Sequence, residues 1–218
     1  MPDQLPLRLV LASASPARRK ILQAAGIDPD VLVSGVDESL VRTDSAEELC
    51  LELARLKAQA VLTRLRPAAD ERTLVIGCDS VLEFDGEIFG KPADSVDATR
   101  RWQRMRGRSG VLHSGHCLVD ATAGRRAEAV ASTTVHFADV SDREIDTYVA
   151  TGEPLAVAGA FTIDGLGGPF VERIEGDPST VIGLSLPLLR RLLAELDLTI
   201  TDLWTKVAPG GQATEPLG

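Results

Sequence analysis

Two carboxylates of this chain follow apolar runs that have the composition of buried strands. Asp79 comes directly after Leu74–Cys78, and Glu38 comes shortly after Val31–Val36. We expect each to lie at a strand end, where a carboxylate either accepts hydrogen bonds from nearby amides or serves as a metal ligand and general base. Taken singly, each position favours a carboxylate that only accepts hydrogen bonds from nearby amides. The balance changes when a lysine on an apolar helix face is considered with them.

That lysine is Lys57. Ser45 and Glu48 form a capping-box pattern, which predicts a long helix to about Leu65. The residues three and four positions away from Lys57 are Leu53, Ala54, Ala60 and Val61. A lysine on such an apolar stripe must extend its ammonium to water or meet an anion. Three ionisable groups in buried positions favour a functional site over three unrelated structural groups.

A second set of polar residues opens the first predicted helix. The segment Ser13–Arg19 reads SASPARR, with Ser15 as the N-cap and Pro16 at the first helical position. The hydroxyl of Ser13, free backbone amides and the Arg18 guanidinium are groups that bind phosphate at a helix start. The alternative is an ordinary capped surface helix, because this way of beginning a helix is common.

Lys91 follows a predicted hairpin. The dipeptide DG at residues 85–86 lies between two apolar runs, which is a strong hairpin signal. We expect the hairpin to bring Lys91 near Asp79. Otherwise Lys91 is a solvated turn residue.

The remaining pattern predicts one mixed α/β domain. Strand and helix signals alternate in the first half of the chain, and hairpin signals follow. No repeat or shift in composition divides residues 1–206, whereas residues 207–218 are rich in Pro, Gly and polar residues and are expected to be a disordered tail. Further helices are expected at about 97–105, 141–150 and 185–196, and further strands at about 111–119, 127–137 and 170–174.

Composition disfavours several classes of protein. A net charge of −9 with 4% aromatic residues argues against a nucleic-acid partner. No apolar run approaches the roughly 20 residues of a membrane helix, and the N-terminus lacks a signal-peptide pattern. We therefore expect a cytoplasmic protein with no membrane partner. The three cysteines are widely spaced and odd in number, which indicates reduced thiols rather than disulfides or a zinc site.

Eight motifs follow one another along the chain, from about Leu9 to Leu193. They are LASASPARRKIL, VDES, LARLKAQA, IGCDSVL, GKP, YVATGEPL, AGAFTIDGLGG and IEGDPSTVIGLSLPLL. Each is weak alone, but in this order they resemble the Maf family of nucleotide pyrophosphatases. The resemblance implies a mixed, elongated sheet with flanking helices and a central cleft, similar to inosine triphosphate pyrophosphatases, and often a homodimer. It also implies metal-dependent hydrolysis of a nucleoside triphosphate to the monophosphate and pyrophosphate.

The resemblance assigns roles to the matching positions of this chain. Asp79 matches the catalytic acid, which activates the attacking water or holds the metal, and Glu38 matches its partner carboxylate. The implied metal is a divalent cation, with Mg²⁺ expected first and Mn²⁺ or Co²⁺ as alternatives. The positions that match phosphate-handling residues are Ser13, Arg18, Lys57 and Lys91.

Three positions depart from the best-known dTTP/UTP branch of the family. That branch has Arg, Thr and Gln where this chain has Ala17, Ser80 and Asp164. The Asp164 carboxylate would accept two hydrogen bonds from a guanine edge, but it would be repelled by the carbonyls of uracil or thymine. The sequence therefore predicts guanine-like or broad specificity.

Two other functions stay open at this point. A non-hydrolysing nucleotide-binding regulator of cell division or septum formation would need the nucleotide pocket but not the carboxylates. A phosphomonoesterase would need a nucleophile motif, and none is evident. The presence of both Glu38 and Asp79 favours the enzyme, for which the resemblance suggests house-cleaning of non-standard nucleotides.

Overall fold

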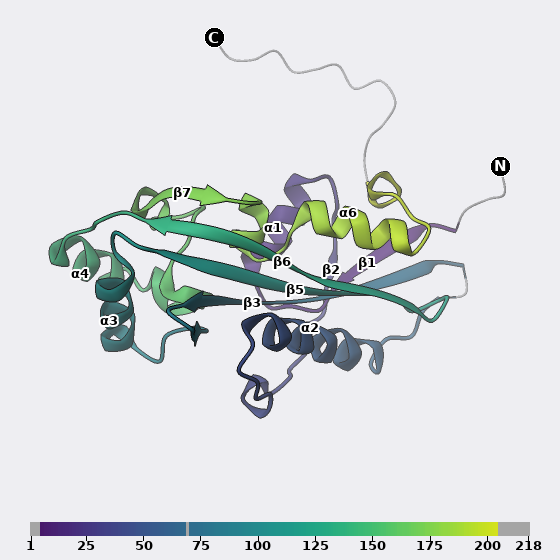
Figure 1. Ribbon diagram of the computed structural model, residues 1–218. Helices are drawn as coiled ribbons and strands as arrows, with labels where there is room; N and C mark the ends of the chain where they lie inside the picture. Colours follow the sequence, from purple (N-terminus) through teal and green to yellow (C-terminus); the bar gives the residue numbers. More distant parts are fainter. Residues whose placement is uncertain (1–4, 69, 205–218) are drawn as a thin grey trace, which may run out of the picture.

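The computed structural model describes residues 5–68 and 70–204, and the tail expected at 207–218 lies outside them. Within these residues one mixed sheet contains β1 (Leu7–Leu11), β2 (Asp30–Val31), β3 (Arg72–Phe84), β4 (Glu87–Phe89), β5 (Ser109–Asp120), β6 (Arg125–Phe137) and β7 (Val171–Glu175). The strand order is β2-β1-β3-β5-β6-β7, with β4 paired to β3 beside this path. β1 is parallel to both neighbours, and the other pairs are antiparallel. The long strands β3, β5 and β6 give the sheet its elongated shape (Figure 1).

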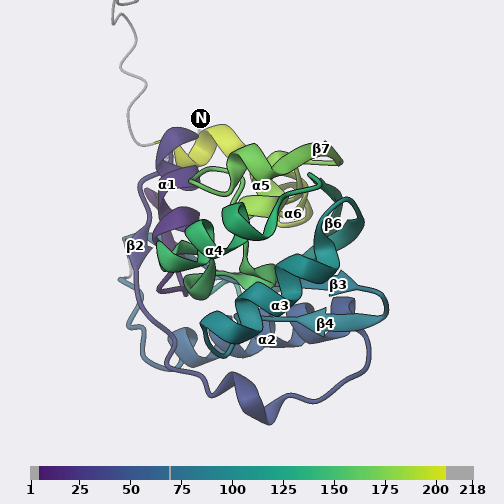
Figure 2. The same cartoon turned by 90° about the vertical axis from the view of Figure 1, so that its left-hand side faces the viewer.

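Helices cover both faces of this sheet. α2 (Ala46–Leu62) lies on one face, and α1 (Pro16–Ala24) and α6 (Leu186–Glu195) lie on the other (Figure 1). α3 (Ser95–Met105) and α4 (Asp142–Ala150) pack together at one end of the molecule, which faces the viewer in Figure 2. The predicted mixed α/β class with flanking helices is confirmed. No helix within the described ranges has the length and apolar character to span a membrane.

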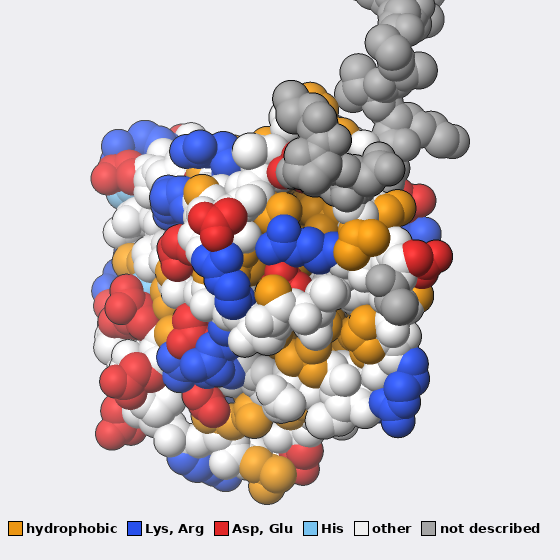
Figure 3. Space-filling view, turned by 90° about the vertical axis from the view of Figure 1, so that its right-hand side faces the viewer, with side chains coloured by type: hydrophobic (Ala, Val, Ile, Leu, Met, Phe, Trp, Pro, Cys, Tyr) orange, Lys and Arg blue, Asp and Glu red, His pale blue; other side chains and the backbone are white. Residues whose placement is uncertain are grey.

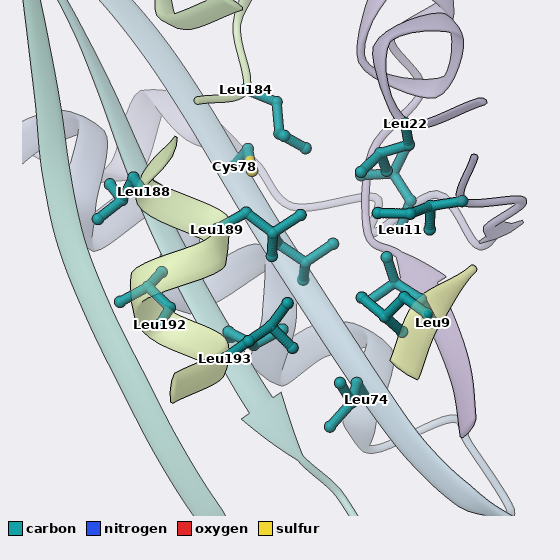
Figure 4. Packing of buried hydrophobic residues seen from close by; sticks show 14 of the residues in the cluster. Leu9, Leu11, Leu22, Leu74, Cys78, Leu184, Leu188, Leu189, Leu192 and Leu193 are labelled. Atoms are coloured by element: carbon teal, nitrogen blue, oxygen red, sulfur yellow. The ribbon is translucent and has the colours of Figure 1, made fainter. Parts of the chain in front are cut away.

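Side-chain alternation along β3 divides the core between these helices. Leu74, Ile76 and Cys78 point toward α1 and α6 and pack with the leucines of α6 (Figure 4). Val75 belongs to the cluster on the α2 side. Because successive residues of a strand point to opposite faces, Asp79 is directed toward α2. The three cysteines are buried and unpaired, as expected.

Two glycines allow α2 to lie unusually close to the sheet. A Cβ on Gly77 would lie 2.1 Å from the backbone oxygen of Ala54, and a Cβ on Gly115 would lie 2.3 Å from that of Cys50. Gly115 is also the β5 residue directly opposite Asp79 in the β3–β5 register. The backbone of α2 therefore rests on the part of the sheet that carries Asp79.

Two predicted strand boundaries are wrong, and both errors concern site residues. β3 continues through Asp79 to Phe84, because β5 pairs with it on both sides of that residue. The strand expected at residues 31–36 is limited to β2, since β1 ends at Leu11 and offers no longer edge for pairing. Asp79 thus lies in mid-strand, and Glu38 begins a short 3₁₀ helix rather than ending a strand. α2 also ends earlier than expected, at Leu62.

A histidine is enclosed in the same part of the sheet. His116 in β5 is fully buried; its Nε2 accepts a hydrogen bond from the Ser185 amide at 2.8 Å, and its Nδ1 lies 3.0 Å from the Ser114 carbonyl. This pattern requires the neutral ring, with the proton on Nδ1. Burial lowers the pKa of His116 to about 4, because a charged imidazolium would be desolvated there.

Acid is therefore expected to weaken the fold through His116. Between the ordinary pKa of 6.5 and the folded value of about 4, the unfolded chain binds a proton that the folded chain does not, so the free energy of unfolding falls as pH falls. In urea titrations at several pH values, the stability advantage of wild type over His116→Gln should shrink by about 2 kcal/mol between roughly pH 7.5 and pH 5. An advantage that is constant over this window would contradict the buried neutral ring.

Candidate active site

Lys57 joins the two carboxylates that the sequence singled out. Its Nζ lies 2.5 Å from Asp79 Oδ1 and 2.6 Å from Glu38 Oε1. Lys57 and Asp79 are both 7% exposed, whereas 53% of the Glu38 side chain is exposed. Glu38 reaches the pair from the segment between β2 and α2, which follows the outer edge of the molecule in Figure 2. The predicted convergence of these three residues is present in the structure.

Burial shapes the chemistry of Asp79. Desolvation raises the pKa of its carboxyl group above the ordinary value, and the positive charges of Lys57 and Arg18 oppose that rise. The Lys57 ammonium that donates to Asp79 Oδ1 favours the ionised form of the carboxylate. An ionised carboxylate with a raised pKa is a better proton acceptor near neutral pH than a solvated aspartate.

Arg18 connects the start of α1 to the middle of the sheet. It donates to the Gly183 carbonyl through Nε at 2.8 Å, to Ser13 Oγ through Nη1 at 3.0 Å and to Ser80 Oγ through Nη2 at 3.1 Å. Ser80 follows Asp79 in β3 and points to the opposite face of the sheet, so Arg18 and Ser13 approach this part of β3 from the α1 side. The positive charge of Arg18 nevertheless acts on Asp79. The Ser15 hydroxyl caps α1 by accepting from the Arg18 amide, as predicted.

A directional chain of hydrogen bonds continues from Arg18 into the core. The Ser114 hydroxyl donates to the Thr180 carbonyl at 2.9 Å, so the hydroxyl of Ser80 must donate to Ser114 Oγ across 2.8 Å. Ser80 can then accept from Arg18. The Ser80 hydroxyl is thus already engaged in orienting Arg18, which connects this specificity candidate with the predicted phosphate-binding group.

The other predicted residues are less closely connected to this centre. Lys91 is exposed and has no hydrogen bond or ion pair within residues 5–68 and 70–204, so its expected proximity to Asp79 stays a prediction. Ala17 is half-buried on α1 beside Arg18. Asp164 is exposed, and its side chain has no hydrogen-bond or ion-pair partner in the described part of the chain.

Glu153 is a residue of this region that sequence reasoning missed. Its carboxylate accepts hydrogen bonds from the Tyr148 hydroxyl, the Thr162 hydroxyl and the amides of Leu166 and Gly167. Burial alone would raise its pKa, but these hydrogen bonds lower it. The only sequence signal for this role is Glu153 in the segment GEP, ahead of a glycine cluster. Its hydrogen-bond donors are Tyr148, which precedes it, and residues 9 to 14 positions after it, so spacing alone could not identify them.

The same contacts explain the glycines of this loop. A Cβ on Gly165 would lie 2.6 Å from Glu153 Oε2, and a Cβ on Gly167 would lie 2.4 Å from the Tyr148 hydroxyl. These glycines therefore allow the loop to pack closely against the side chains of Glu153 and Tyr148. Asp164 belongs to this loop, and Glu153 anchors the loop on either side of it, through the Thr162 hydroxyl before it and the Leu166 and Gly167 amides after it.

The two carboxylates fit a divalent cation bound together with substrate. No cluster of three or more His, Cys, Asp or Glu that could hold a metal occurs within the described ranges, so protein ligands alone do not complete a metal site there. Mg²⁺ is commonly held by one or two carboxylates plus substrate phosphates. The oxygens of Glu38 and Asp79 that contact one Nζ are at most about 5 Å apart, an upper limit that includes the ~3–4 Å separation of ligands around Mg²⁺. Glu38 and Asp79 are therefore suitable ligands for such a cation.

Other hollows of the molecule lie away from this cluster. One is lined by Arg8, Asp28, Asp30, Glu71 and neighbouring apolar residues near β1 and β2. On the face of the molecule viewed in Figure 3, acidic and basic side chains are interspersed rather than gathered into one charged field. Neither observation indicates a polyanion site there.

Comparison with known protein sequences gives matches over almost the whole chain. The chain is 84% identical to a nucleoside triphosphate pyrophosphatase of Salinispora tropica, over 99% of this chain and 94% of that protein. It is 55% identical to a protein of the same name from Streptomyces avermitilis, over 94% and 98% respectively. Among solved structures, the Staphylococcus aureus Ham1 protein aligns at 16% identity with a TM-score of 0.41, over 61% of this chain and 72% of that one. The family model described as Maf-like protein matches residues 8–196, and the chain therefore belongs to the Maf family.

Proposed function

We propose that this protein hydrolyses nucleoside triphosphates to the nucleoside monophosphate and pyrophosphate. The observation that carries the proposal is the contact of the buried Lys57 ammonium with both Asp79 and Glu38, in a chain whose relatives at 84% and 55% identity are named nucleoside triphosphate pyrophosphatases. A non-hydrolysing regulator would have no use for two converging carboxylates. The enzyme is therefore favoured over that alternative.

In the proposed reaction, water attacks the α-phosphorus and the bond from this phosphorus to the α–β bridging oxygen breaks. Asp79 accepts the proton of the water, since its carboxylate is enclosed and its pKa is raised by burial. Lys57, Lys91 and Arg18 stabilise the negative charge that moves to the departing pyrophosphate. A divalent cation held by Glu38, Asp79 and the phosphates would supply charge neutralisation and an acidified water.

Base preference belongs to the same proposal. Asp164, Ala17 and Ser80 would favour guanine-like or broad recognition, because a carboxylate accepts from the guanine edge and repels pyrimidine carbonyls. The family resemblance adds two further parts to the proposal, a homodimer and a house-cleaning role against non-standard nucleotides. The cytoplasmic location is proposed because the sequence lacks a membrane-helix pattern and a signal-peptide pattern. The net charge of −9 fits a small-molecule substrate rather than a nucleic acid.

Product analysis tests the reaction directly. Purified protein with Mg²⁺ and a panel of natural and methylated triphosphates should release pyrophosphate and monophosphate, separated by ion-exchange chromatography. In ¹⁸O-labelled water the label should enter the monophosphate, because attack occurs at the α-phosphorus. kcat/KM for GTP should equal or exceed the values for UTP and dTTP.

The opposite outcomes are equally informative. Orthophosphate as the product would indicate a phosphomonoesterase. Nucleotide binding without turnover in Mg²⁺, Mn²⁺ or Co²⁺ would indicate the regulator. A clear advantage of UTP and dTTP over GTP would contradict only the proposed base preference.

A further inference from the structure

The ammonium of Lys57 lies in the position that a divalent cation would need. Both partners of its Nζ are carboxylates, at 2.5 and 2.6 Å, and they are the same two oxygens that are suited to a metal. A metal ion bound to both oxygens at about 2.1 Å would come into direct contact with Nζ. Two cations cannot share this position, because their repulsion at such a distance is large where water is excluded.

The surroundings of Lys57 explain why its ammonium lies there. Its stem is enclosed against the sheet by α2, which Gly77 and Gly115 allow to approach closely, and only 9% of its side chain is exposed. An ammonium buried without a partner would be strongly disfavoured. Asp79 and Glu38 supply that partner, and Lys57 in turn relieves the repulsion between the two carboxylates.

We propose that Lys57 acts as an internal counter-cation that holds Glu38 and Asp79 together and excludes a divalent cation until nucleotide phosphates draw its ammonium away. This inference rests on the proposed function, since it assigns Lys57 to the phosphates when substrate binds. Its consequence is thermodynamic coupling: phosphate binding improves the affinity of the carboxylates for the metal, and metal binding improves the affinity for phosphates by the same factor. Lys57 is then a positioning residue as well as a phosphate ligand.

Lys91 offers a matched comparison within the same chain. It has the same charge and the same predicted role toward the triphosphate, but it is exposed and contacts neither carboxylate. Loss of its charge should leave the carboxylate pair unaffected. Any effect specific to Lys57 can therefore be separated from a general loss of positive charge.

Mn²⁺ binding to the full-length, nucleotide-free protein is the first test, measured from the electron paramagnetic resonance signal of free Mn²⁺. Lys57→Met should bind Mn²⁺ about tenfold more tightly than wild type, or better, because the competing charge is gone. Lys91→Met should match wild type. Lys57→Gln keeps a polar end group in case Met perturbs the fold, and it should shift in the same direction as Lys57→Met. Equal or weaker Mn²⁺ binding by both Lys57 variants would overturn the proposal.

A second measurement separates this role from a purely structural one. In EDTA, the affinity for guanosine 5′-(α,β-methylene)triphosphate should fall in Lys57→Met, whereas the Mn²⁺ affinity of the nucleotide-free variant rises. Damage to the fold would weaken both, and that result would count against the proposal. The Mn²⁺ measurement needs no turnover, so it distinguishes the two proposals. If the wild-type protein hydrolysed no nucleotide but Lys57→Met bound Mn²⁺ more tightly than wild type, the proposed reaction would be refuted and the counter-cation role would be supported.

Discussion

Replacing Asp79 with asparagine is expected to lower kcat by about 10²–10⁴-fold or more, the range typical of a positioned proton acceptor. The amide cannot accept the water proton, and it removes one of the two negative charges that face Lys57. Asn can still accept a hydrogen bond from Lys57 Nζ, so the packing of β3 against α2 should persist. Steady-state kinetics with the best nucleotide of the panel, together with thermal unfolding, measures both effects.

Asp85→Asn is the matched control for this variant. It makes the same chemical change in the hairpin turn that follows β3. There the carboxylate is exposed and pairs with Arg108. Asn tolerates the left-handed backbone there, with φ 52°. Its kcat should stay within about twofold of wild type, because surface ion pairs contribute little. An Asp79→Asn enzyme that retained turnover within about tenfold of wild type would exclude Asp79 as the base.

Local signals in the sequence predicted the starts of the helices well. Ser15, Ser45 and Ser141 each cap the helix expected after them, because a capping side chain bonds to amides only two or three residues away. A similar signal at Asp177-Pro178 marks the short helix α5 (Pro178–Ile182), which was not predicted. Such features are readable because cause and effect lie within one turn of the chain.

Strand boundaries near the site were not predictable from local pattern. Asp79 interrupts an apolar run, which is typical of a strand end, yet β5 supplies Gly115 as its opposite residue and the ladder continues. Whether a polar residue ends a strand or lies within it depends on a partner about 36 residues away along the chain. The charge anomaly at Asp79 was therefore recognisable, but its place in the strand was not.

In the candidate site too, some features were predictable from the sequence and others were not. Lys57 and the two carboxylates were identified because each conflicts with an apolar setting. The hydrogen-bond chain from Arg18 through Ser80 and Ser114 was not identifiable, because small hydroxyl residues are common and their partners come from distant elements. The role of Glu153 was not predictable for the same reason, because its hydrogen-bond donors are not neighbours in the sequence. The sequence thus indicated which charges need partners, and the fold determines how they are oriented.

The close packing of α2 makes Gly115→Ala a substitution that should disturb the site strongly without changing any charge. The new methyl group would lie 2.3–2.5 Å from backbone atoms of Cys50 and Leu51, and backbone cannot move aside as a flexible side chain can. α2 must shift, at a cost of about 1–3 kcal/mol or more. Thermal unfolding should show a decrease in Tm of roughly 2–10 °C. kcat should fall as well, because a shift of α2 moves Lys57 away from Asp79.

Gly90→Ala tests whether this effect comes from the contact or from the loss of a glycine in general. A Cβ on Gly90 meets nothing within 4 Å, and its backbone is not in the left-handed region. Its Tm should therefore equal that of wild type or rise slightly, since alanine restricts the unfolded chain more than glycine does. If Gly115→Ala kept both the wild-type Tm and the wild-type kcat, α2 would have to tolerate displacement freely. The geometry that binds Lys57 to its two carboxylates would then depend on Lys57 itself and not on the packing beneath it.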